Sequence, residues 1–74
     1  MTLNTKSNFH WPGEKVFYPY RAGDDFYEAL IEMHHKLSDE QSERANSRLI
    51  LMLANHIGDL TVLRQAMDAA REDL

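Results

Sequence analysis

Residues 38–59 read SDEQSERANSRLILMLANHIGD, and this stretch decides the fold. Ser38 followed three residues later by Gln41 is a capping box, in which each side chain accepts a hydrogen bond from the other residue's backbone N–H. Gly58 suits the left-handed position that ends a helix, and Asp59 suits the cap of a new one. The stretch therefore predicts a helix over 39–57 that leads directly into another helix.

The predicted middle helix is unusually apolar in its second half. Its main apolar stripe consists of Ala45, Leu49, Met52, Leu53 and Ile57. The run from Leu49 to Ala54 is apolar on nearly all sides, and such a helix is normally covered on all sides. Leu51 lies off the main stripe, on the same face as Arg48 and Asn55. The flanking helices cannot easily cover that face as well, so we expect a further partner there.

One helix is expected on each side of the middle one. Asp24 or Asp25 is a suitable cap for a first helix over about 25–37, where Phe26, Met33 and Leu37 share a stripe. A third helix is expected over about 60–72. Short connections make neighbouring helices antiparallel or steeply crossed. The predicted fold is all-α, a small three-helix domain over residues 24–74.

Residues 1–23 form a different zone, which we predict to be an extended N-terminal arm. It holds both prolines, and Tyr18-Pro19 indicates an extended step. The arm is rich in aromatic side chains, namely Phe9, Trp11, Phe17, Tyr18 and Tyr20. Aromatic residues serve cores and interfaces alike. Two interpretations remain open: the arm covers the apolar middle helix, or it binds a partner.

Composition excludes several classes of protein. The chain has 74 residues, enough for one domain, and no cysteine for disulfides or thiol chemistry. The net charge is −4, made of +2 in residues 1–23 and −6 in residues 24–74, which disfavours nucleic-acid binding. The longest apolar run, Leu49–Ala54, is far below the roughly 20 residues of a membrane span. Since no secretory signal is visible either, we expect a cytoplasmic protein.

The sequence offers little catalytic chemistry. Ser42 and Ser47 lack an adjacent base, and the three glycines are isolated, so neither a nucleophile nor a phosphate loop is indicated. We predict that the protein is not an enzyme and needs no cofactor.

A metal- or small-ligand-binding protein is the alternative, because Glu32 and His35 are spaced to share a helix face. Di-iron bundles use two such pairs and two further glutamates, so the set is incomplete. His56 lies in the middle helix near its apolar stripe, and we expect it to be buried, as a functional imidazole or as a hydrogen-bonded core histidine.

Several segments resemble a known family. They are residues 24–31, 37–38, 48–59 and 62–63, with Leu-Ala-Asn-His-Ile-Gly-Asp at 53–59 as the most specific part. These residues are similar to a family of short bacterial proteins catalogued as a domain of unknown function. The resemblance covers roughly residues 24–70 and leaves the arm outside. It carries no established activity, and its association with neighbouring flavin-dependent oxidoreductases implies an accessory role beside such an enzyme.

The sequence therefore predicts a non-catalytic interaction protein. It would be a homo-oligomer or a small accessory subunit of a larger protein. The partner would be another protein chain, with no nucleic acid and no membrane involved. The expected contact residues are Phe9, Trp11, Phe17, Tyr18, Tyr20, Arg48, Leu51 and Asn55.

Overall fold

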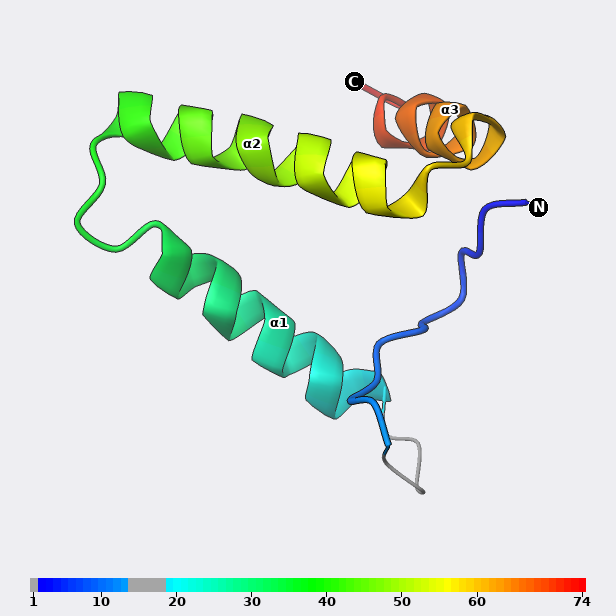
Figure 1. Cartoon of the computed structure of the whole chain (residues 1–74), viewed down its shortest axis with the longest axis horizontal. Helices are drawn as coiled ribbons and strands as arrows, with labels where there is room; N and C mark the ends of the chain where they lie inside the picture. The colour runs from blue at the N-terminus through cyan, green and yellow to red at the C-terminus, as the bar shows by residue number, and fades with distance from the viewer. Residues whose placement is uncertain (1, 14–18) are drawn as a thin grey trace. The chain divides into compact units, whose positions relative to one another are not determined.

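The computed structural model describes residues 2–13 and 19–74, apart from the side chains of Pro19 and Tyr20 (Figure 1). It contains three helices: α1 (Pro19–Met33), α2 (Asp39–Ile57) and α3 (Leu60–Ala70). No strand occurs in the described ranges. The expected small all-α fold of three helices is confirmed. No described helix is both long enough and apolar enough to cross a membrane.

The first helix begins earlier than the sequence predicts. It starts at Pro19, not at Asp24 or Asp25. The extended step expected at Tyr18-Pro19 concerns Tyr18, which lies outside the described residues. Proline has no N–H to donate and its fixed φ suits the first position of a helix, where the N–H would be unpaired anyway. The last residues of the predicted arm therefore belong to α1, while residues 2–13 have no regular secondary structure.

The first helix also ends earlier, at Met33 instead of residue 37. The His34 and His35 N–H groups donate to the carbonyl groups of Ile31 and Glu32 at 3.1 and 3.0 Å. Donor and acceptor are three residues apart here, not four as inside an α-helix, and this tighter turn is common at helix ends. Lys36 follows with a φ of 61°, in the left-handed region that stops a right-handed helix. A turn over 34–36 thus separates α1 from α2, where the sequence had indicated almost no loop.

The predicted signals around α2 and α3 are confirmed. The Ser38 N–H donates to Gln41 Oε1 at 3.0 Å and the Gln41 N–H donates to Ser38 Oγ at 3.1 Å. Gly58 has a φ of 72°, and its N–H donates to the Ala54 carbonyl at 2.8 Å. Asp59 Oδ1 accepts hydrogen bonds from the backbone N–H groups of Thr61 and Val62, two and three residues later, at 2.9 and 3.3 Å. These caps fix both ends of the α2–α3 connection.

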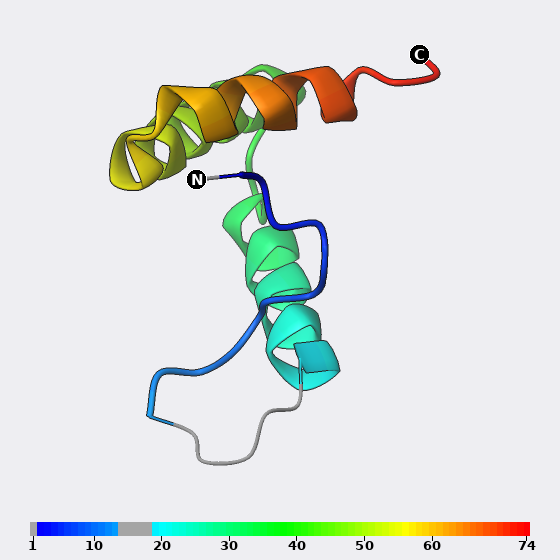
Figure 2. The ribbon, with the colours of Figure 1, turned by 90° about the vertical axis from the view of Figure 1, so that its right-hand side faces the viewer.

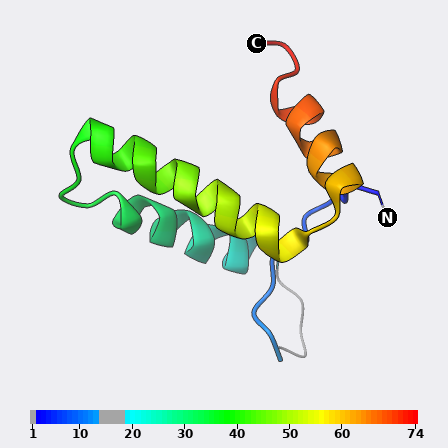
Figure 3. The same ribbon diagram turned by 45° about the horizontal axis from the view of Figure 1, so that its top comes forward.

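The chain divides into two compact units. The amino-terminal unit is Asn4–Ser42 and contains α1 and most of the arm, and the carboxy-terminal unit is Met1–Leu3 with Glu43–Leu74. In the carboxy-terminal unit α3 leaves the end of α2 at a steep angle (Figure 3). The Leu3 N–H donates to Gln65 Oε1 at 2.8 Å, which holds the start of the chain against α3. Val62 is the buried hydrophobic residue described in this unit.

In the amino-terminal unit the arm meets α1 near the start of the helix (Figures 1 and 2). Among the described residues of this unit, the buried hydrophobic one is Ala22. The Phe9 and Phe26 rings are 5.7 Å apart between centroids and tilted by 33°, within the usual range for aromatic pairs. Phe9 of the arm thus contacts α1.

Candidate functional site

The second half of α2 carries a ring of exposed apolar side chains, which we call the α2 ring. It consists of Ile50, Leu51, Met52 and Leu53, with 64, 70, 69 and 48% of their surface exposed. Successive helical residues point 100° apart, so these four cover most of the circumference. A single neighbouring helix covers a stripe little more than about 100° wide. No single packed helix can shield the whole ring.

Polar side chains border Leu51 on the ring. Arg48 and Asn55 are both exposed, three residues before and four residues after Leu51, so the three residues share one face of α2. An apolar centre with a polar rim is the usual composition of a protein interface. These three predicted contact residues are therefore brought together by the helix itself.

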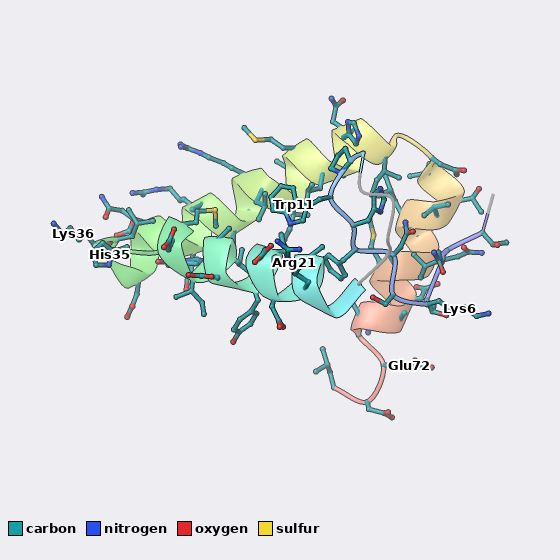
Figure 4. All side chains as sticks on the ribbon, turned by 90° about the horizontal axis from the view of Figure 1, so that it is seen from below. Lys6, Trp11, Arg21, His35, Lys36 and Glu72 are labelled. Atoms are coloured by element: carbon teal, nitrogen blue, oxygen red, sulfur yellow. The ribbon has the colours of Figure 1, made fainter. Side chains whose placement is uncertain are left out.

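A second candidate site is an open cleft between the arm and α1, which we call the aromatic cleft. It has a volume of about 330 Å³ and is lined by Phe9, His10, Trp11, Ala22, Asp25, Phe26 and Ala29. The Trp11 indole Nε1–H donates to Asp25 Oδ2 at 2.8 Å, which holds the indole beside α1 (Figure 4). His10 Nδ1 donates to the Asn8 carbonyl at 2.8 Å. All of these residues belong to the amino-terminal unit.

The other predicted arm residues are placed only in part. Phe17 and Tyr18 lie outside the described residues. Tyr20 lies in the first turn of α1, with its side chain outside the description. Of the five predicted aromatics, the structure thus brings Phe9 and Trp11 together, and they belong to a different unit from the α2 ring.

Sequence reasoning missed the α1 side of the cleft. Asp25 was interpreted as a helix cap and Phe26 as core, because the helix was expected to start beside them. With α1 starting at Pro19, Ala22, Asp25, Phe26 and Ala29 follow helical spacing on one face. The proline-first signal at the helix start would have revealed that face.

The described residues do not provide the ligands that the metal-binding alternative requires. Glu32 and His35 are exposed and line one hollow with Ile31, of about 430 Å³. Figure 4 shows His35 near the end of α1. Within residues 2–13 and 19–74, no group of three or more histidine, aspartate or glutamate side chains could hold a metal ion.

The expectation of a buried His56 is wrong. It is exposed, because it lies in the last turn of α2, and the chain turns away at Gly58 into a steeply inclined α3. An exposed imidazole in this position is neither a core histidine nor part of an enclosed site.

A family model described as protein of unknown function, DUF2783, matches residues 3–72. The chain belongs to the DUF2783 family. The match includes residues 3–23, which the resemblance in the sequence had left out, so the DUF2783 domain contains both the arm and the three helices. No curated protein and no solved structure matches the chain.

Proposed function

We propose that this DUF2783 protein is a non-catalytic interaction protein that binds a second protein chain through the α2 ring. The observation that carries the proposal is the exposure of four consecutive apolar side chains that point around the whole of α2. Contiguous exposed apolar patches of this kind mark binding sites. The partner is another copy of the chain or a larger subunit; an oxidoreductase as the larger subunit rests on the sequence resemblance alone.

Leu51 is the centre of the proposed interface. It is the most exposed member of the α2 ring, at 70%. Burying a leucine side chain fully contributes about 1.5–3 kcal/mol, or roughly a tenfold to hundredfold change in affinity. Arg48 and Asn55 supply polar groups at the rim, and arginine is among the residues that most often dominate binding energy.

The test is association of the full chain and of two variants. Leu51→Asp places a charge at the centre of the ring and should abolish association, while helix content by circular dichroism stays unchanged. Met67→Asp is the matched control, because Met67 is an exposed apolar side chain on α3, outside the ring, and receives the same new charge. It should associate like the unchanged protein.

Two measurements cover the two kinds of partner. Sedimentation velocity over a range of concentrations detects self-association, and purification of the tagged chain from its native host detects a stoichiometric larger subunit. The proposal fails if the protein is monomeric at all concentrations and no co-purifying chain is lost in Leu51→Asp.

A further inference from the structure

We propose that the aromatic cleft binds the guanidinium group of an arginine side chain of the partner protein. This inference rests on the proposed function for the identity of the partner, but it concerns a separate site in the amino-terminal unit. The cleft joins three aromatic rings, Phe9, Trp11 and Phe26, to one carboxylate, Asp25.

The rings supply the attraction for a cation. Aromatic faces carry negative charge density, and cations within about 6 Å of a ring centre are bound by it. The Phe9 and Phe26 rings lie 5.7 Å apart, tilted and on the same cleft, and 46 and 44% of their surfaces are exposed. Trp11, whose indole is the best ring for such contacts, is 51% exposed on the same cleft. Each ring therefore keeps surface available for a ligand.

Asp25 supplies the opposite charge. Its Oδ2 accepts from the Trp11 indole, so one hydrogen bond positions both the ring and the carboxylate. On α1, Asp24 and Glu28 lie one and three positions from Asp25. Arg21, four positions before Asp25, is the cation of this stretch, so three carboxylates stand against one guanidinium; the whole chain has a net charge of −4. Such a surface attracts cations and repels anions. Charge complementarity thus selects a basic group over an acidic or neutral one.

Guanidinium fits this cleft better than ammonium. It is planar, stacks on aromatic faces and is more weakly hydrated than an ammonium, so less hydration is lost when it leaves water. The cleft volume of about 330 Å³ is at the lower end for ligand sites, which suits one side chain in place of a larger molecule. An arginine at a partner's surface meets these requirements and would anchor the partner beside α1.

Trp11 gives a direct readout, because it is the one tryptophan of the chain. The experiment titrates the full chain with a pentapeptide of one arginine flanked by glycines, with blocked ends, and follows the indole Nε1–H signal by NMR. The control peptide carries citrulline, which has nearly the same shape as arginine but no charge. We expect saturable binding of the arginine peptide and at least fivefold weaker binding of the citrulline peptide.

Variants locate the site. Asp25→Asn keeps an oxygen that can accept from Trp11 but removes the charge, and should weaken arginine binding about five- to thirtyfold. Phe9→Leu keeps apolar volume but removes one ring and should also weaken it, which keeps the test decisive if one variant fails to fold. Leu51→Asp lies in the other unit and should bind the arginine peptide like the unchanged chain.

Three results would overturn the inference. They are equal binding of both peptides, which indicates an apolar occupant; unchanged binding in folded Asp25→Asn and Phe9→Leu; and no saturable binding of the arginine peptide. If the peptide binds but Leu51→Asp has no effect on partner association, the proposed function fails while the cleft remains a cation site. If the peptide binds and the chain associates with no protein, the partner as the source of the arginine is rejected.

Discussion

The indole Nε1–H of Trp11 donates to Asp25 Oδ2 at 2.8 Å, which connects the arm to α1 across fourteen positions of the chain. Hydrogen bonds to ionised acceptors are stronger than bonds between neutral groups. Together with the Phe9–Phe26 ring contact, this bond holds residues 9–11 of the arm on α1. Residues 9–11 thereby belong to the amino-terminal unit, and the Trp11–Asp25 hydrogen bond can be tested by itself.

Asp25→Ala should release the Trp11 indole. Because the acceptor is lost, we expect the indole N–H to exchange with solvent several-fold faster than in the unchanged chain. Asp25→Asn keeps an acceptor oxygen and should exchange at an intermediate rate. Hydrogen exchange by NMR measures this signal without ambiguity, since the chain has one tryptophan. Equal exchange in all three proteins would show that the bond does not form in solution.

Two glycines of the helical region should respond to alanine in opposite directions. Gly23 lies inside α1, and a Cβ there would meet the Phe9 ring at 3.7 Å, an ordinary contact distance. Gly23→Ala should therefore raise the free energy of unfolding by about 0.5–1 kcal/mol. Gly58 has a φ of 72° and nothing closer than the Asn55 carbonyl at 3.8 Å. Gly58→Ala should lower it by about 1–2 kcal/mol through backbone strain alone.

Thermal and urea unfolding followed by circular dichroism compare the two variants. The pair is its own control, because each change adds one methyl group. Destabilisation by Gly23→Ala would mean that the Phe9 ring cannot accommodate the methyl group. If Gly58→Ala leaves the free energy of unfolding unchanged, the α2–α3 connection relaxes out of the left-handed conformation.

The sequence was sufficient where local hydrogen bonds decide the structure. Ser38, Gln41, Gly58 and Asp59 form the predicted caps, because a cap depends on residues within three or four positions. The bounds of α2 were predicted correctly for that reason. The start of α1 was predicted wrongly. Asp24 and Asp25 match the residue preference of a helix cap, but the helix already begins five residues earlier, at Pro19.

The sites were predictable to different degrees. The position of Leu51 beside Arg48 and Asn55 could be predicted because helical spacing alone determines it; their role in binding stays a prediction. The aromatic cleft was not found, because it depends on a contact between Phe9 and Phe26, seventeen positions apart, that no local pattern encodes. The burial expected of His56 failed for a similar reason, since it depended on the direction that α3 takes after Gly58.

The isolated protein should bind no stoichiometric transition metal. Glu32 and His35 share one hollow, but no described third carboxylate or imidazole completes a site there. Elemental analysis of untagged protein should find iron, zinc and manganese each well below one equivalent. A full equivalent that is lost in His35→Ala but kept in His56→Ala would contradict this and favour the metal-binding alternative.

Val62 and Leu51 should respond differently to truncation, because one is buried and the other is exposed. Val62 has 8% of its surface exposed and Leu51 has 70%. Val62→Ala removes two buried methyl groups and should lower the free energy of unfolding by about 1.5 kcal/mol at any protein concentration. At low concentration Leu51→Ala should change it by less than about 0.5 kcal/mol, as expected for an exposed position.

The contrast separates a binding surface from a core. A leucine in the core of the single chain would cost about 2–5 kcal/mol on truncation to alanine. Urea unfolding at low micromolar concentration measures both variants in the same buffer, with Val62→Ala as the control for sensitivity. If Leu51→Ala costs as much as a core leucine there, the α2 ring is shielded within one chain and is not a surface for a second one. If its cost is small for the single chain and grows when a partner or a second copy is bound, the side chain is buried by association, because a bound state stabilises the fold by mass action.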